Sequence, residues 1–142
     1  MSWLPKQKIV VPVDFSEDSF QAIDTALELV AGPAAIHIVY VLPVFDPAEP
    51  DVVWSTVNDE TRRRHAEQAL HERLAAAKYK GLNFHVLFGE PGHKITELAG
   101  DEGVELIVLS SHGRTGISRL LIGSIAEKVV RLAHCPVLVL RK

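Results

Sequence analysis

Residues 8–16 read Lys-Ile-Val-Val-Pro-Val-Asp-Phe-Ser, an unbroken apolar run followed by a short polar turn. A strand buried on both faces of a parallel sheet has this continuous pattern, whereas a half-exposed strand alternates apolar with polar residues. Ser16 predicts a helix N-cap, and Phe20, Ile23, Leu27 and Val30 then recur at helical spacing. The stretch therefore predicts a strand that leads directly into a helix.

The rest of the chain repeats this alternation. Further strands are predicted at 36–42, 83–88, 104–109 and 136–140, helices at 58–80, 91–99 and 125–133, and a proline-rich loop at 43–57. Strands alternating with helices predict an α/β fold: a doubly wound, five-stranded parallel sheet of the Rossmann-like type with helices on both faces. Because 142 residues with 47% apolar content fill one core, residues 1–142 are expected to form a single domain.

The composition excludes several classes of protein and site. With 15 Lys and Arg against 18 Asp and Glu, the chain has no basic footprint for nucleic acid, and no segment approaches the roughly 18 apolar residues of a membrane span. The single cysteine, Cys135, excludes an intrachain disulfide, and the six histidines other than His112, expected at the surface or at sheet edges, show no metal-binding spacing. We therefore expect a cytoplasmic protein with no nucleic-acid partner, no membrane partner and no metal ligands.

Ligands of open α/β sheets bind beyond the carboxyl ends of the strands, where the strand order reverses. Three segments of this chain are predicted to meet there: residues 12–16 after the first strand, 41–43 after the second and 110–124 after the fourth. A binding site is therefore expected between these segments.

The third segment has the composition of a phosphate loop. Glycines at 113, 116 and 123 let a ligand approach the backbone closely, and Gly123-Ser124 opens the last predicted helix, whose N-terminus favours an anion. Arg114 adds a cation, and the Ser124 hydroxyl can contact phosphate or a phosphate-bound metal. The alternative is that the glycines only shape turns and that Ser124 only caps the helix. The succession of strand, glycine loop and helix N-terminus favours phosphate binding.

Two further residues have alternative interpretations. Asp14 follows a buried strand and can contact a ribose or simply form an Asx-turn before the helix. His112 is a candidate acid or base because the unperturbed pKa of a histidine lies near neutrality, but no nucleophile or carboxylate is identifiable beside it, so a contact with ligand or backbone is favoured. No catalytic residue is predicted.

These residues resemble the universal stress protein family, whose nucleotide-binding members carry Gly-x-x-Gly, nine residues, then Gly-(Ser/Thr) before the last helix. Gly113, the nine residues after it and Gly123-Ser124 match that spacing, whereas Ser110 stands where the family has its first glycine. The supporting matches are Val-Pro-Val-Asp-Phe-Ser at 11–16, Gly-Glu-Pro-Gly at 89–92, Ser-His-Gly-Arg-Thr-Gly at 111–116 and Cys-Pro-Val-Leu-Val-Leu at 135–140.

The resemblance implies an adenine nucleotide alpha hydrolase-like fold that binds ATP, with or without Mg²⁺. It implies that Val13, Asp14 and Val41 hold the adenosine, with Ser110 beside the ribose. It further implies a homodimer formed through the last strand, Pro136 to Leu140. The candidate nucleotide-binding residues are Pro12, Val13, Asp14, Val41, Ser110, His112, Gly113, Arg114, Gly123, Ser124 and Ile125.

The leading hypothesis is an ATP-binding stress-response protein that acts as a ligand-responsive binding and signalling module. Any hydrolysis should be slow, because the chain lacks a Walker A motif and an evident base or arginine finger. The alternative is a nucleotide-free dimer that acts through protein contacts, which Ser110 favours. A dehydrogenase or phospho-receiver domain is disfavoured, because the first strand is followed by neither Gly-x-Gly-x-x-Gly nor an acidic cluster.

Overall fold

The computed structural model describes residues 2–44, 59–111 and 123–141. Within these ranges, five strands form one parallel sheet in the order β3-β2-β1-β4-β5. The strands are β1 (Ile9–Pro12), β2 (Ile36–Leu42), β3 (Asn83–Phe88), β4 (Leu106–Ser110) and β5 (Val137–Leu140). The α-helices are α1 (Glu17–Leu27), α3 (Asp59–Arg73), α4 (Pro91–Asp101) and α5 (Ser124–Leu132).

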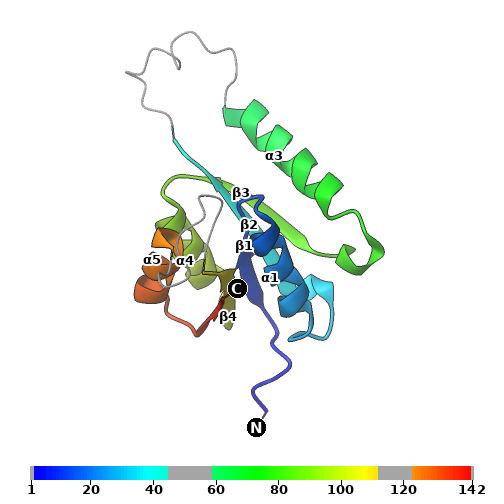
Figure 1. Ribbon diagram of the computed structural model, residues 1–142, viewed down its shortest axis with the longest axis vertical. Helices are drawn as coiled ribbons and strands as arrows, with labels where there is room; N and C mark the ends of the chain where they lie inside the picture. Colours follow the sequence, from blue (N-terminus) through cyan, green and yellow to red (C-terminus); the bar gives the residue numbers. More distant parts are fainter. Residues whose placement is uncertain (1, 45–58, 112–122, 142) are drawn as a thin grey trace.

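Helices α1 and α3 lie on one side of the sheet, and α4 and α5 lie on the other (Figure 1). The predicted doubly wound α/β fold with a five-stranded parallel sheet is therefore confirmed. The chain starts at the central strand β1, runs outward through β2 to β3, and returns on the other side of β1 with β4 and β5. The strand order thus reverses between β1 and β4, where ligands of such sheets collect.

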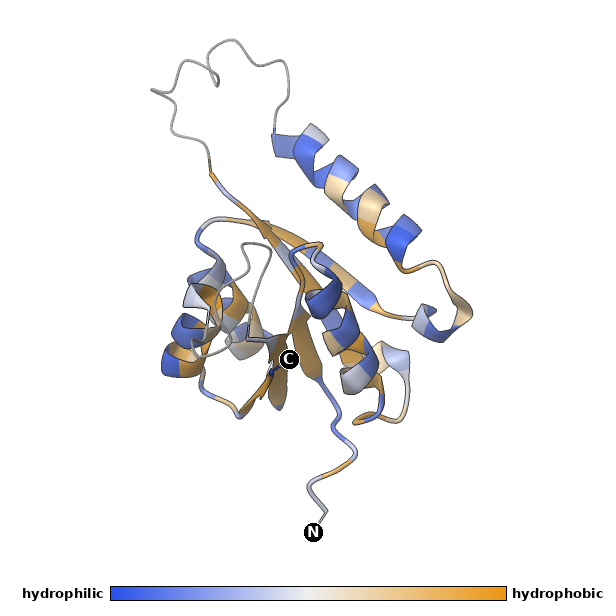
Figure 2. Cartoon of the chain, viewed as in Figure 1, coloured by the Kyte–Doolittle hydropathy of each residue, from blue (hydrophilic) through white to orange (hydrophobic). Residues whose placement is uncertain are grey.

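Strand β1 forms the centre of the core, as its continuous apolar run predicts. Ile9, Val10 and Val11 are all 0% exposed. Ile9 and Val11 pack on the α1/α3 side, and Val10 packs on the α4/α5 side, because successive side chains of a strand point to opposite faces. The strands are mostly apolar, while the outer faces of the helices are mostly hydrophilic (Figure 2).

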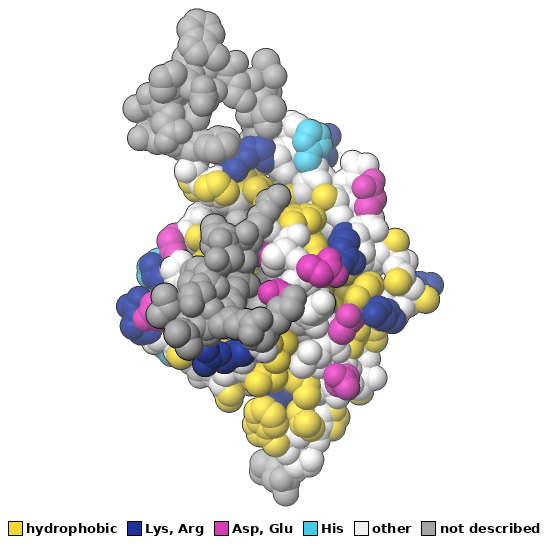
Figure 3. Space-filling view, viewed as in Figure 1, with side chains coloured by type: hydrophobic (Ala, Val, Ile, Leu, Met, Phe, Trp, Pro, Cys, Tyr) yellow, Lys and Arg dark blue, Asp and Glu magenta, His cyan; other side chains and the backbone are white. Residues whose placement is uncertain are grey.

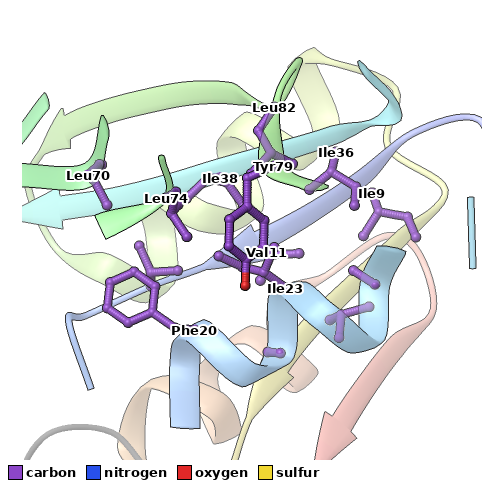
Figure 4. Packing of buried hydrophobic residues seen from close by; sticks show 14 of the residues in the cluster. Ile9, Val11, Phe20, Ile23, Ile36, Ile38, Leu70, Leu74, Tyr79 and Leu82 are labelled. Atoms are coloured by element: carbon purple, nitrogen blue, oxygen red, sulfur yellow. The ribbon is translucent and has the colours of Figure 1, made fainter. Parts of the chain in front are cut away.

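Each face of the sheet has its own apolar cluster. On the α1/α3 side, aliphatic side chains of the strands meet Phe20 and Ile23 of α1 and Leu70 of α3 (Figure 4). On the α4/α5 side, strand residues meet Ile95 of α4 and Val129 of α5. Full burial of one such side chain contributes about 1.5–3 kcal/mol, so both helix pairs are held to the sheet mainly by apolar contact.

The helix predicted at 58–80 was wrong at its C-terminal end, because α3 stops at Arg73. A short 3-10 turn, Ala77–Tyr79, follows, and it brings the Tyr79 ring into the α1/α3 cluster. The Tyr79 hydroxyl donates a hydrogen bond of 2.7 Å to the Asp24 carboxylate on α1. A continuous helix would carry Tyr79 past this position, so the tertiary contact overrides the local helical pattern.

Smaller corrections concern α1 and the histidines. Helix α1 ends at Leu27, before Val30, which pairs instead with Lys6 in an isolated parallel bridge. His37, expected at the surface or a sheet edge, is 9% exposed on β2. Its Nδ1 lies 2.9 Å from Nε2 of His85 on the edge strand β3, so each ring provides the hydrogen-bond partner that burial demands.

The other predicted ends agree with the observed elements or differ from them by one or two residues. Of the predicted loop at 43–57, only Pro43 and Val44 belong to the described residues. Among the described helices, none is both long and apolar enough to cross a membrane. Acidic and basic side chains are interspersed on the face shown in Figure 3.

Candidate functional site

A cavity of about 310 Å³ opens at the carboxyl ends of β1, β2 and β4, at the point where the strand order reverses. Strand ends, the loop after β1 and the first turns of α4 and α5 contribute its walls. The lining residues are Pro12, Val13, Asp14, Ser19, Val39, Tyr40, Val41, Pro91, Ile95, Leu109, Ser110, Ser111, Gly123, Ser124, Ile125 and Ala126.

Most of the residues singled out in the sequence lie together on this wall. They are Pro12, Val13, Asp14, Val41, Ser110, Gly123, Ser124 and Ile125. The remaining three candidates, His112, Gly113 and Arg114, lie outside the described residues. The three segments predicted to meet beyond the strand ends are therefore brought together wherever the structure describes them.

The loop after β1 is held by a small hydrogen-bond network. Oδ1 of Asp14 accepts hydrogen bonds from the backbone N–H of Ser16, at 3.0 Å, and from the Ser16 hydroxyl. The Asp14 N–H donates to Oγ of Ser19, whose hydroxyl donates to the Ser16 carbonyl. Asp14 thus forms the Asx-turn considered from the sequence, and it lines the cavity as well.

Phe15 bends this loop with a backbone φ of 65°, in the left-handed region. For a residue other than glycine this conformation costs roughly 1–2 kcal/mol. The Phe15 ring packs edge-on against Phe20, at 5.6 Å between centroids, and against Tyr40, at 4.9 Å. These aromatic contacts offset the cost and hold Asp14 at the cavity wall.

The start of α5 is tied to the ends of β4 and β5. The Gly123 N–H donates to the Ser111 carbonyl at 2.6 Å, and the Ser111 N–H donates to the Leu140 carbonyl at 2.8 Å. The first intrahelical bond runs from Glu127 N–H to the Gly123 carbonyl. The amides of Ser124, Ile125 and Ala126 therefore have no partner within the helix. All three residues line the cavity, so the positive end of the α5 dipole lies at its wall.

The opposite part of the cavity is apolar. Val39, Val41 and Leu109 line it from the strands, and Pro91 and Ile95 line it from the first two turns of α4. Sequence reasoning missed all of these except Val41. Val39 could have been found, because it lies two residues before Val41 and so shares its face of the strand. Pro91 and Ile95 line the cavity because of how α4 packs, and no local sequence pattern predicts that packing.

The charges around the cavity are few. Asp14 is the one charged residue among the described lining residues. Just outside, burial by itself raises the pKa of Glu90, but the His93 N–H, the Lys128 ammonium and the Gly92 N–H outweigh it and hold that pKa below its ordinary value. The described residues contain no group of three or more His, Cys, Asp or Glu side chains that could hold a metal ion.

Comparison with solved structures shows that this architecture is widely shared. A universal stress protein from Lactobacillus plantarum superposes with a TM-score of 0.76 at 28% identity, over 96% of this chain and 98% of that one. Two further structures of the same fold have lower identity. One is a universal stress protein in complex with cAMP, with a TM-score of 0.65 at 23% identity over 96% of this chain and 98% of that one. The other is the Archaeoglobus fulgidus protein in complex with dAMP, with a TM-score of 0.61 at 22% identity over 96% and 98%.

Sequence comparison gives closer relatives. Universal stress protein MJ0531 from Methanocaldococcus jannaschii is 38% identical over 143 residues, which cover 96% of this chain and 82% of that protein. Universal stress protein YxiE from Bacillus subtilis is 30% identical, over 94% of this chain and 98% of that protein. The model of the universal stress protein family matches residues 6–141, and this chain belongs to that family.

Proposed function

We propose that this protein binds an adenine nucleotide, ATP with or without Mg²⁺, in the cavity between β1, β4 and α5, and acts as a ligand-responsive module of the stress response. The observation that carries the proposal is the pairing, in one cavity, of an apolar slot with the N-terminus of α5. Membership of the family and the solved cAMP and dAMP complexes of proteins with the same fold make adenine nucleotides the first ligands to test.

The base binds in the apolar slot between Val39, Val41 and Ile95. In β2 the backbone groups of odd-numbered residues point toward β1, because the Val39 carbonyl accepts from Val13 N–H and the Leu42 carbonyl accepts from Gly89 N–H next to β3. The last residue pair between β1 and β2 is Pro12 with Val39. Val41 lies two residues beyond it, so its backbone N–H and C=O point into the cavity. One donor and one acceptor side by side match the edge of an adenine.

The ribose and the phosphates lie toward α5. Asp14 and Ser110 line the part of the cavity next to the slot and can bond ribose hydroxyls. The first amides of α5, with Gly123, Ser124 and Ile125, bind the phosphates through close backbone approach and the helix dipole. By the family motif, Gly113 and Arg114 add to this phosphate site, and His112 contacts ligand or backbone.

Magnesium, when present, is held chiefly by the nucleotide. The ion commonly keeps several waters and takes few protein ligands beside the substrate phosphates. The Ser124 hydroxyl at the start of α5 fits that pattern. We expect any hydrolysis to be slow, since Asp14 is the only candidate base among the described lining residues and none of those residues is a cation.

Calorimetry on nucleotide-stripped protein tests the proposal. We expect ATP to bind with a micromolar dissociation constant, to bind more weakly without Mg²⁺, and to raise the midpoint of thermal unfolding by mass action. GTP serves as the control, because its base presents a different arrangement of donors and acceptors to Val41. An absence of ATP binding up to millimolar concentration would overturn the proposal.

One observation favours a second candidate function, a nucleotide-free dimer that acts through protein contacts. Ser110, at the end of β4, projects its side chain where the nucleotide-binding motif has glycine, and it lines the cavity. The Ser110→Gly variant separates the candidates. If only this variant binds ATP, the native protein is the nucleotide-free module.

A further inference from the structure

Gly92 lies at the point where α4 touches α5. It is the second residue of α4 and is buried, and a β-carbon placed on it would lie 2.8 Å from Cδ and Cγ of Lys128 and 3.0 Å from Cβ. Contacts below 3 Å are not tolerated between carbon atoms, so one side would have to move. Since the contact reaches the root of the Lys128 side chain, that side chain cannot relieve it by rotating its far end.

Glu90 forms charged contacts at the same junction between α4 and α5. As the N-cap of α4, its carboxylate accepts hydrogen bonds from Gly92 N–H at 3.2 Å and from His93 N–H at 2.8 Å. The Lys128 ammonium lies 3.3 Å from the same carboxylate. The stem of Lys128 thus fills the space that Gly92 leaves, and its charged end pairs with the cap of the helix that it lies against.

The residues next to this junction form two walls of the cavity. Pro91 and Ile95 line it from α4, and Ser124 and Ala126 line it from α5. Lys128 follows Ser124 by four residues and therefore lies on the same side of α5, one turn on. Ile95 and Ala126 also pack in one apolar cluster, so a displacement of α4 from α5 changes the space between them.

We propose that Glu90, Gly92 and Lys128 form a lock that fixes the start of α4 against α5 and thereby sets the width of the ligand cavity. The three are positioning residues: none of them lines the cavity, and they act on the ligand through Pro91, Ile95 and the first turn of α5. The proposal rests on the proposed nucleotide binding as far as affinity is concerned, but the lock itself is a property of the protein alone.

The variant Gly92→Ala tests the lock, with Gly100→Ala as its matched control. Both exchange glycine for alanine within α4, but a β-carbon on Gly100 meets nothing within 4 Å. We expect Gly92→Ala to weaken ATP binding about tenfold, and Gly100→Ala to leave it within about twofold of the native value. The Lys128→Ala variant lacks the side chain with which the new β-carbon collides. Adding Gly92→Ala to that variant should therefore change its ATP affinity by about threefold or less.

A purely structural role predicts a different result. In that case Gly92→Ala lowers the midpoint of thermal unfolding while the folded fraction binds ATP with native affinity, and this result would overturn the proposal. If Gly92→Ala does not fold, Lys128→Ala alone serves as the test, since it opens the lock without overpacking. A native dissociation constant for Lys128→Ala would then exclude the lock.

A measurement without nucleotide separates the lock from the proposed function. Methyl signals of Ile95 and Ala126 in the NMR spectrum of the ligand-free protein should shift in Gly92→Ala and remain unchanged in Gly100→Ala. The double variant of Gly92→Ala and Lys128→Ala should give the same signals as Lys128→Ala alone, because the collision is absent from both. If the native protein binds no ATP but these shifts occur, the proposed function fails and the lock stands. If the native protein binds ATP and Gly92→Ala changes neither the methyl signals nor the affinity, the lock fails and the proposed function stands.

Discussion

Gly123 lies at the cavity wall and is the N-cap residue of α5. Its backbone angles, φ of −61° and ψ of 155°, are ones that any residue adopts, and its N–H is bonded to the Ser111 carbonyl. Glycine is therefore not required there by the conformation of the chain. The proposed close approach of a ligand to the backbone would account for a glycine at this buried position.

Gly123→Val should consequently abolish ATP binding and leave the fold intact, because the added side chain enters the cavity while the backbone keeps its angles. Calorimetry measures the binding, and circular dichroism checks the fold. Gly32→Val is the matched control, since a β-carbon on Gly32 meets nothing within 4 Å and Gly32 has an extended φ of −166°. Equal ATP affinity in the native protein and in Gly123→Val would remove the proposed phosphate site.

His37 gives the stability of the protein a dependence on pH. Burial, followed by the nearby His85 and Lys8, lowers the pKa of His37, and Glu102 opposes the shift. A histidine in the unfolded chain has its ordinary pKa near 6.5. As pH falls through about 6.5, the unfolded chain therefore takes up a proton that folded His37 does not, and the free energy of unfolding decreases.

His37→Gln should accordingly show a smaller loss of stability between about pH 7.5 and pH 5.5 than the native protein, because it lacks the titrating ring. Urea unfolding at a series of pH values measures the effect. His65→Gln, a substitution at an exposed position of α3, is the control and should follow the native curve. Parallel curves for native protein and His37→Gln would show that this histidine does not govern the pH dependence.

At the scale of elements, the connection between α3 and β3 depends on one long-range contact. Tyr79 is 7% exposed, and its hydroxyl bonds to Asp24, 55 residues earlier in the chain. Lys78 pairs with the same carboxylate at 3.1 Å, but its side chain is 58% exposed. The partly buried hydrogen bond is therefore expected to stabilise the fold more than the solvated ion pair.

Tyr79→Phe should lower the free energy of unfolding by about 0.5–1.5 kcal/mol, since it removes a hydroxyl and leaves part of the Asp24 carboxylate without its partner. Lys78→Gln is the control and should change stability by less than about 0.5 kcal/mol. Chemical denaturation measures both values. A larger decrease in the free energy of unfolding for Lys78→Gln than for Tyr79→Phe would show that the ion pair stabilises the fold more than the hydrogen bond does.

At the scale of the whole molecule, β5 is the edge strand of the sheet beyond β4. Its Leu138 is 36% exposed, and Ile125 and Val130 of the adjacent α5 are 39% and 50% exposed. An apolar edge strand offers unpaired backbone groups to another chain. These features support the proposal that two copies of the protein associate through residues 136–140.

Leu138→Glu should therefore shift the protein from dimer to monomer, because a carboxylate at the centre of the contact is desolvated without a partner. Sedimentation equilibrium across a concentration series measures the association. Glu97→Gln, an exposed change on α4, is the control and should stay dimeric. A native protein that is monomeric at high concentration would rule out this interface.

The proposal that residues 1–142 form one domain has its own test. Both apolar clusters share the same sheet, so they are expected to unfold together in one cooperative transition. Scanning calorimetry should give a van't Hoff enthalpy equal to the calorimetric enthalpy. Two separate transitions would show that the two sides of the sheet are independent units.

The sequence by itself determined the elements and the region of the site. The apolar runs at β1 and β2, the Ser16 cap and the glycine that opens α5 are local signals, and the βα alternation orders them into a parallel sheet whose strand ends meet. For that reason Asp14, Val41 and Ser124 could be assigned to one cavity before any contact was known.

Only the tertiary structure decided where α3 ends, which histidine is buried, and how α4 closes the cavity. In each case the deciding partner lies far away in the chain: Asp24 for Tyr79, His85 for His37, and Lys128 for Gly92. Helical periodicity and capping act over a few residues, so they carry no information about such pairs. Packing selects them, because a buried polar atom needs a partner and two helices can approach closely only where a side chain is missing.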